Sequence, residues 1–129
     1  MLIPYKDYEI YVESYGDENL EPFIMLNGIM MSTASWHSFY GLFTPYKRVI
    51  LIDLLDQGKS SKLHGLEYDL SLQVEAVEAV VNALDLKNIN LFGISYGGEV
   101  AMKYAVTYPA NIKKLLLFNT TAKTSKWLK

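Results

Sequence analysis

The sequence predicts an α/β protein with a mostly parallel sheet between layers of helices. Short apolar runs of strand length recur along the chain, segments with helical spacing separate several of them, and the runs are apolar at nearly every position. Strands that are apolar on both faces need helices on both sides of the sheet. Strands that alternate with helices are typical of parallel pairing. Together these observations favour a three-layer α/β/α architecture.

Five segments have the pattern of a strand. The first alternates apolar and polar residues, whereas the others are short, continuous apolar runs, as expected for buried strands. Polar or turn-forming residues end two of these runs, at Asn27-Gly28 and at Asp53. The expected strands are residues 8–15, 23–26, 48–52, 89–92 and 113–118.

Three segments are predicted to be helical. A short helix is expected over residues 36–43. The clearest pattern runs from Leu70 to Leu84, where apolar residues recur on one helix face and Asp69 or Ser71 is available as the N-cap. The third helix follows a glycine-rich turn near residue 95 and is expected to stop at Pro109, because proline breaks a helix.

Composition indicates a globular protein and excludes several functions. Half of the residues are hydrophobic and 20% are charged, which is far from the composition of disordered chains. The formal net charge is −2 and no basic stripe is present, so nucleic-acid binding is not expected. The chain has no cysteine and no clustered metal-ligand motif, so we expect neither a cofactor nor a metal site.

The organisation of the chain suggests one domain over residues 1–129. No repeat or low-complexity linker divides it. The N-terminal residues lack a basic segment followed by a long apolar one, and no stretch approaches eighteen apolar residues. We therefore expect a soluble, cytoplasmic protein that does not bind a membrane.

The most informative motif is Gly93-Ile94-Ser95-Tyr96-Gly97, which matches the G-x-S-x-G nucleophile elbow. An elbow needs a strand before it and a helix after it, and hydrophobic spacing independently predicts both. The serine of an elbow occupies a strained backbone conformation, and glycines two residues away on either side prevent collisions. We therefore interpret Ser95 as a nucleophile, with the backbone N–H of Tyr96 at the helix N-terminus as an oxyanion donor.

Two other interpretations of this turn are weaker. Ser95 alone would also suit a helix N-cap, a role in which serine is common. The glycines match neither the phosphate-binding P-loop nor the dinucleotide fingerprint, because their spacing differs from both.

Three further stretches make the chain resemble the α/β-hydrolase family over nearly all of its length. One of them is the helix from Leu70 to Leu84 with the run from Lys87 to Gly93, which resembles the family's approach to the elbow. Leu26-Asn27-Gly28-Ile29 lies where that family usually has His-Gly followed by the second oxyanion donor, so the resemblance implies that the Ile29 N–H has this role. Residues 53–60 resemble the family's D-x-R-G-x-G-x-S loop. In this loop, Leu55 replaces the usual arginine and Asp56 replaces the usual glycine. In the earlier stretch, Asn27 replaces the usual histidine. These departures bear on subfamily more than on fold.

The resemblance also implies what the chain lacks. In the family the acid and then the histidine of the triad follow the serine, on loops after later strands. Residues 119–129 contain no Asp, Glu or His, and the lid segment is absent as well. We therefore expect the chain to correspond to the N-terminal part of a hydrolase, through the strand at 113–118, and to be nearly inert by itself.

Residues before Ser95 offer alternative candidates for the base and the acid. His37 is expected on a helix surface or partly buried, and His64 follows a loop at the same sheet edge as the elbow, so either is a candidate base. Asp53 and Asp56 invite an acid or metal assignment, but an aspartate after a strand is usually a turn or cap residue.

Two functional hypotheses follow. In the first, the parent protein is a serine hydrolase that cleaves a small ester, thioester, lactone or related acyl substrate through an acyl-enzyme. A serine rather than an aspartate at position 95 argues against a dehalogenase. In the second, the chain is a non-catalytic association module, because Leu115 to Phe118 would form an apolar sheet edge that pairs with a second copy.

Overall fold

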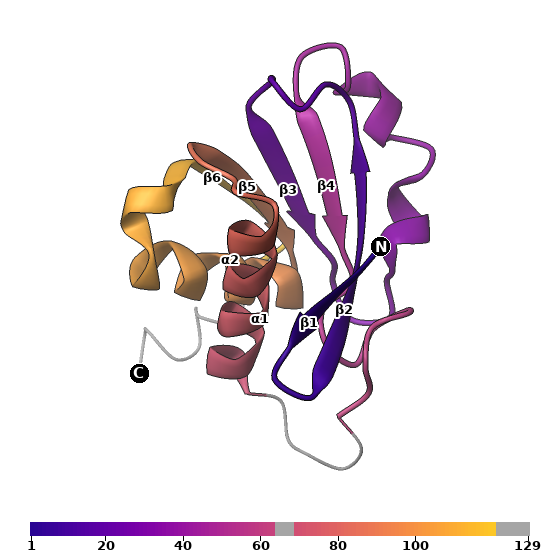
Figure 1. Cartoon of the computed structure of the whole chain (residues 1–129), viewed down its shortest axis with the longest axis vertical. Helices are drawn as coiled ribbons and strands as arrows, with labels where there is room; N and C mark the ends of the chain where they lie inside the picture. The colour runs from indigo at the N-terminus through magenta and orange to yellow at the C-terminus, as the bar shows by residue number, and fades with distance from the viewer. Residues whose placement is uncertain (64–68, 121–129) are drawn as a thin grey trace.

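Six strands form one sheet in the computed structural model, which describes residues 1–63 and 69–120 (Figure 1). Their order across the sheet is β1-β2-β4-β3-β5-β6. The strands are β1 (Leu2–Tyr5), β2 (Tyr8–Tyr15), β3 (Pro22–Leu26), β4 (Arg48–Ile52), β5 (Ile89–Ile94) and β6 (Ile112–Phe118). The helices are α1 (Leu70–Ala83), α2 (Tyr96–Thr107) and the short 3-10 helices η1 (Thr33–Trp36), η2 (Tyr40–Leu42) and η3 (Pro109–Asn111).

The sheet is mostly parallel, which confirms the predicted fold class. Strands β4, β3, β5 and β6 pair in parallel, whereas β1 pairs antiparallel with β2 and β2 pairs antiparallel with β4. Leu26 at the end of β3 lies opposite Ile52 of β4 and Gly93 of β5. The carboxyl ends of these three strands therefore meet at one edge of the sheet.

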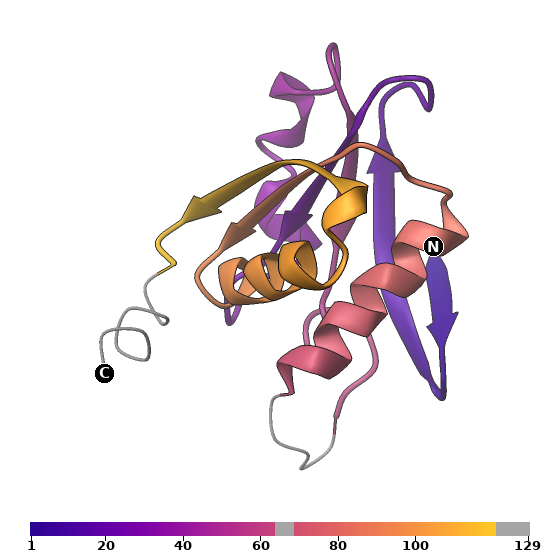
Figure 2. The same cartoon turned by 90° about the vertical axis from the view of Figure 1, so that its left-hand side faces the viewer.

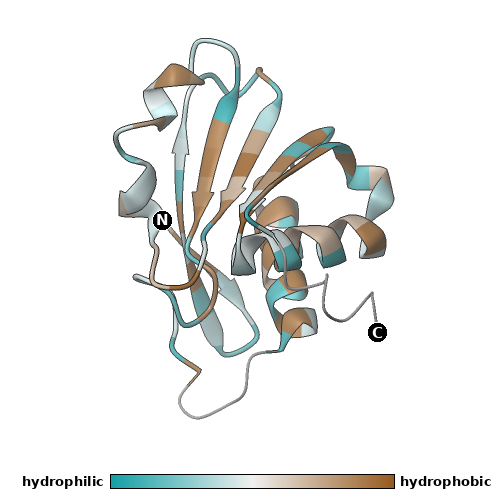
Figure 3. Ribbon diagram, turned by 180° about the vertical axis from the view of Figure 1, so that it is seen from behind, coloured by the Kyte–Doolittle hydropathy of each residue, from teal (hydrophilic) through white to brown (hydrophobic). Residues whose placement is uncertain are grey.

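Each face of the central strands packs on a different layer. Ile24 and Ile50 belong to a core that α1 and α2 cover. Phe23 and Val49, one residue earlier, belong to a second core that includes Trp36 of η1. Figure 2 shows the two α-helices and the segment with η1 and η2 on opposite sides of the sheet. Figure 3 shows hydrophobic colour along the central strands, as expected for strands buried on both faces.

The helix predicted from residues 70 to 84 is confirmed as α1. Its N-cap is Asp69, whose Oδ1 accepts hydrogen bonds from the N–H groups of Ser71 at 2.9 Å and Leu72 at 3.4 Å. Its inward face includes Val77 and Val81, both buried. A fully buried valine or leucine contributes about 1.5–3 kcal/mol, so packing on the sheet supplies most of the stability of this helix.

The helix predicted over residues 36–43 is confirmed only in part. The structure has two separate 3-10 helices there, η1 and η2. Gly41 lies inside the segment, and its several aromatic residues have low helix propensity. The side chain of Trp36 is held by a hydrogen bond to Asn27, so tertiary contact rather than helix propensity determines its conformation.

Strand β1 was not predicted from the sequence. It is four residues long and contains Pro4, which the sequence pattern does not favour in a strand. β1 lies at the edge of the sheet, where proline is tolerated, and its only pairing in the described structure is with β2.

Within residues 1–63 and 69–120, no helix is both long and apolar enough to cross a bilayer.

Candidate active site

Three polar residues follow the ends of three neighbouring strands. Asn27 follows β3, Asp53 follows β4 and Ser95 follows β5. Because these strands are parallel neighbours, the three residues gather at one edge of the sheet. In open α/β sheets, ligands bind outside this carboxyl edge.

Ser95 joins β5 to α2 in a backbone conformation that non-glycine residues rarely adopt. Its φ is 55° and its ψ is −120°. The Ser95 N–H donates to the carbonyl oxygen of Phe118 at 3.0 Å, and the Ser95 carbonyl accepts from the Gly98 N–H at 2.9 Å. These bonds to β6 and α2 hold the strained residue in place. The residue itself is exposed.

Two glycines beside Ser95 have no room for a side chain. A Cβ added to Gly93 would lie 2.3 Å from the carbonyl oxygen of Gly97. A Cβ added to Gly97 would lie 2.4 Å from the carbonyl oxygen of Leu26, at the end of β3. Both contacts are with backbone, which cannot move aside as a flexible side chain can. The glycines therefore permit the tight turn and its close approach to β3.

The two predicted oxyanion donors lie on either side of this turn. Tyr96 is the first residue of α2, so its backbone N–H is at the positive end of the helix dipole. Gly28 lies beside Ser95, since a Cβ on Gly28 would be 3.3 Å from the Ser95 Cβ. Ile29 follows Gly28 and is 55% exposed. The loop after β3 and the start of α2 thus flank the serine.

Asn27 anchors the loop that carries Gly28 and Ile29. Its side chain is fully buried, and its Oδ1 accepts a 2.6 Å hydrogen bond from the Trp36 indole N–H. Its Nδ2 lies 3.0 Å from the Ile52 carbonyl oxygen and 3.1 Å from Oε1 of Gln57. The amide that replaces the family's usual histidine therefore joins η1, β4 and the loop after β4.

Gln57 contacts the same loop through its other amide atom. Its Nε2 donates to the carbonyl oxygens of Gly28 at 3.2 Å and of Asn27 at 3.4 Å. Its Oε1 accepts from the Leu54 N–H at 3.0 Å as well as from Asn27. We did not single out Gln57 from the sequence, where the only sign of its importance is its place inside the family-like loop.

Asp53 organises the loop after β4. Its carboxylate is buried and accepts hydrogen bonds from the backbone N–H groups of Thr33 at 2.8 Å and Lys59 at 3.0 Å. Gly58 has a φ of 42°, and a Cβ there would lie 2.2 Å from Asp53 Oδ2. These contacts match the turn and cap interpretation of Asp53. In the described residues, no three His, Cys, Asp or Glu side chains gather as a metal would require.

The two departures inside this loop also have structural explanations. Asp56 has a φ of 77°, in the left-handed region that glycine enters most easily and that aspartate tolerates. Leu55 is completely buried in the core under α1, where the charge of an arginine would need a partner.

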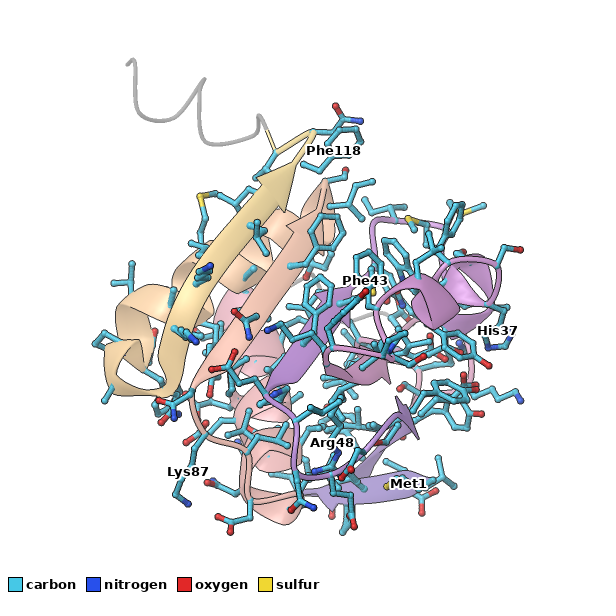
Figure 4. All side chains as sticks on the ribbon, turned by 90° about the horizontal axis from the view of Figure 1, so that it is seen from above. Met1, His37, Phe43, Arg48, Lys87 and Phe118 are labelled. Carbon is cyan, nitrogen blue, oxygen red and sulfur yellow. The ribbon has the colours of Figure 1, made fainter. Side chains whose placement is uncertain are left out.

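His37 is engaged away from Ser95. Its Nε2 lies 2.8 Å from Oε1 of Glu13 on β2, and Figure 4 shows its ring at the periphery of the molecule. Three strand spacings of about 4.8 Å separate β2 from β5 in the sheet. The structure therefore gives no support to His37 as the base for Ser95. His64, the other candidate base, lies outside the described residues.

Glu13 accepts several hydrogen bonds in this second cluster. Tyr11 and Tyr15 donate to its carboxylate at 2.7 Å and 2.8 Å, and Thr33 of η1 donates at 3.3 Å. Partial burial acts to raise the pKa of the Glu13 carboxyl. The hydrogen bonds from Tyr11, His37 and Tyr15 outweigh burial and lower this pKa to about 2. The cluster fastens η1, and with it Trp36, to β2.

Comparison with known proteins agrees with this geometry. The family model described as "alpha/beta hydrolase fold" matches residues 21–129. The chain belongs to this family.

Relatives of this hydrolase-fold chain have diverse chemistry. A cis-3-alkyl-4-alkyloxetan-2-one decarboxylase of Shewanella oneidensis is 34% identical over 79% of the chain and 33% of its own length. A candidate 2-succinyl-6-hydroxy-2,4-cyclohexadiene-1-carboxylate synthase of Bacillus subtilis is 33% identical over 85% of the chain and 40% of its own length. The chain thus spans less than half the length of these relatives.

A solved structure has nearly the same backbone. MGS-M2, an alpha/beta hydrolase enzyme from a Medee basin deep-sea metagenome library, has a TM-score of 0.90 and 38% sequence identity. The match covers 99% of this chain and 47% of that one. An esterase from Exiguobacterium antarcticum has a TM-score of 0.86 and 29% identity, covering 94% of this chain and 45% of the esterase chain.

Proposed function

We propose that this chain carries the nucleophile and oxyanion donors of a serine hydrolase that acts on an ester, thioester, lactone or related small acyl substrate. Ser95 Oγ attacks the acyl carbon and the leaving group departs, which leaves an acyl-enzyme that water then hydrolyses. The N–H groups of Tyr96 and Ile29 hold the negative charge on the former carbonyl oxygen.

The conformation of Ser95 is the observation that carries this proposal. A positive φ costs a serine on the order of 1–3 kcal/mol, and such strain is concentrated at functional sites. A serine that served only as an N-cap would have an ordinary extended backbone, and its side chain would accept a hydrogen bond from an N–H group of α2, whereas the Ser95 side chain accepts none there. The esterase match adds support from a relative's chemistry.

A base and an acid complete this mechanism. The chain's two histidines, His37 and His64, both precede Ser95. We propose that the histidine and carboxylate that activate Ser95 come from outside residues 1–129. Loss of the base can reduce turnover on the order of a millionfold, so we expect the 129-residue chain alone to be nearly inactive.

Fluorophosphonate labelling tests the proposal. The chain is incubated with an alkyl fluorophosphonate with and without imidazole, which serves as an external base, and intact mass gives the extent of labelling. We expect slow labelling without imidazole, faster labelling with it, and none in the Ser95→Ala variant. Rapid labelling without imidazole would contradict the expected inactivity. Equal labelling of Ser95→Ala would contradict the assignment of Ser95.

A second candidate function rests on the edge strand β6. Leu115, Leu116, Leu117 and Phe118 are 38%, 44%, 41% and 56% exposed, and β6 forms one edge of the described sheet. Figure 4 shows Phe118 at the end of this strand. An exposed apolar edge favours pairing with another strand. We propose that two copies of the chain associate through β6, in which case the mass in solution rises with concentration.

A further inference from the structure

We propose that Gln57 is a positioning residue for the oxyanion hole, since it holds the Gly28–Ile29 peptide in the orientation that points the Ile29 N–H toward the oxyanion. This inference rests on the proposed serine-hydrolase function. It concerns a residue at a position that the D-x-R-G-x-G-x-S pattern leaves unspecified, four residues after Asp53.

The argument begins at the Gly28 carbonyl oxygen. That oxygen accepts two hydrogen bonds, from Gln57 Nε2 at 3.2 Å and from the Met31 backbone N–H at 3.2 Å. The Met31 bond closes a local turn within the same loop. Only the bond from Gln57, of these two, connects the carbonyl to another part of the fold, the loop after β4.

Peptide geometry transmits this contact to Ile29. The described residues contain no cis peptide bond, and in a planar trans peptide the C=O and N–H groups point in opposite directions. The carbonyl of Gly28 and the N–H of Ile29 belong to the same peptide. A donor that fixes the carbonyl on the Gln57 side therefore fixes the N–H on the other side.

The amide of Gln57 is itself fixed in one orientation. Its Oε1 faces two donors, the Leu54 N–H at 3.0 Å and Asn27 Nδ2 at 3.1 Å, while its Nε2 faces two carbonyl oxygens. Exchanging the oxygen and nitrogen would oppose donors to donors and acceptors to acceptors. The side chain of Gln57 thus holds the Gly28–Ile29 peptide in a fixed position relative to the end of β4.

Gln73 provides a matched control. It is a buried glutamine on α1 that also binds the loop after β4, where its Oε1 accepts from the Leu55 N–H at 3.0 Å and its Nε2 donates to the Leu55 carbonyl at 2.9 Å. Neither of these bonds involves Gly28 or Ile29. A substitution at Gln73 therefore destabilises the same loop without removing a donor to the oxyanion peptide.

The experiment compares the full chain with Gln57→Leu, Gln57→Glu and Gln73→Leu. Gln57→Glu keeps the acceptor for Leu54 and Asn27 but presents a carboxylate to the Gly28 carbonyl. Two readouts are measured at a temperature at which every variant is folded. One is the rate of fluorophosphonate labelling of Ser95 with imidazole present, and the other is the backbone amide signal of Ile29 in a ¹⁵N–¹H NMR spectrum.

We expect both Gln57 variants to label at least about tenfold more slowly than the unmodified chain, since loss of one oxyanion donor costs on the order of a hundredfold or more. Their Ile29 signal should shift or broaden. Gln73→Leu should lower the melting temperature yet keep the labelling rate and the Ile29 signal.

Three results would overturn the inference. They are an unchanged labelling rate in the Gln57 variants, an unchanged Ile29 signal in them, or an equal loss of labelling in Gln73→Leu. If the unmodified chain labels no faster than Ser95→Ala, the proposed function fails instead. In that case the Ile29 signal still decides whether Gln57 orients the peptide.

Discussion

At the scale of single residues, the candidate site contains a backbone conformation that costs free energy and that Ser95 would not favour in an unfolded chain. Ser95 has a positive φ, and its hydrogen bonds to Phe118 and Gly98 keep it there. Such strain persists only where the surrounding structure imposes it. The arrangement predicts a conflict between stability and function at Ser95.

Substitution of Ser95 tests this conflict. Ser95→Gly should be more stable than Ser95→Ala by about 1 kcal/mol, because glycine adopts a positive φ without the steric cost but loses more conformational entropy on folding. Urea denaturation of the two variants, neither of which carries the hydroxyl, measures the difference. Equal free energies of unfolding would mean that the backbone at position 95 is not strained.

The glycine after Tyr96 predicts a larger effect. Gly97→Ala places a Cβ 2.4 Å from the Leu26 carbonyl oxygen, so we expect a loss of about 3 kcal/mol or more in the free energy of unfolding. Gly41→Ala is the control, because a Cβ at Gly41 has nothing within 4 Å. Thermal denaturation should show a large decrease for the first variant and little change for the second.

At the scale of elements, the segment between β3 and β4 depends on contacts rather than on helix propensity. Glu13 of β2 accepts bonds from Thr33 and His37, at the two ends of η1, and Trp36 of η1 donates to Asn27. Trp36 thus links η1 to Asn27, the residue that anchors the loop beside Ser95.

This contact predicts a dependence of stability on pH. The pKa of Glu13 is lowered to about 2 in the folded chain, below its unfolded value. Its ionised form therefore stabilises the fold above about pH 4.5, and this contribution is lost as the pH falls toward 2. Glu13→Gln should reduce the free energy of unfolding at pH 7 by about 1–3 kcal/mol. It should also make the loss of stability between pH 4.5 and pH 2 less steep.

Melting temperatures between pH 2 and 7 measure this effect. The control is Glu9→Gln, which removes an exposed carboxylate from the same strand. If the melting temperature of Glu13→Gln falls as steeply at low pH as that of the unmodified chain, the acid-induced loss of stability comes from other groups.

At the scale of the whole molecule, β6 connects the candidate site to the sheet edge. Ser95 bonds to Phe118, and the four residues of β6 from Leu115 onward are exposed. We expect Leu116→Lys to weaken self-association, because a lysine on an edge strand opposes pairing. Val106→Lys, on an α2 side chain that is 81% exposed, is the control.

Analytical ultracentrifugation over a range of concentrations measures this association. The unmodified chain and Val106→Lys should increase in mass with concentration, and Leu116→Lys should not. A constant monomer mass for the unmodified chain would contradict pairing through β6.

Much of the fold followed from local patterns, and the exceptions have physical causes. The runs at 23–26 and 48–52 are strands because continuous apolar residues suit a sheet buried on both faces. The spacing from Leu70 predicted α1 because an amphipathic helix has a clear period. The prediction for the segment around Trp36 was only partly right, because contacts with Asn27 and Glu13, which lie on other elements, determine its conformation.

The sequence by itself determined the α/β class and the strand, turn and helix around Ser95, because both depend on residues close together in the chain. Only the tertiary structure decided that β3 lies between β4 and β5. This order brings Gln57 to the Gly28 carbonyl and Trp36 to Asn27. Hydrogen bonds between residues far apart in the chain depend on strand order and close packing, and the local hydrophobic periodicity of the sequence predicts neither.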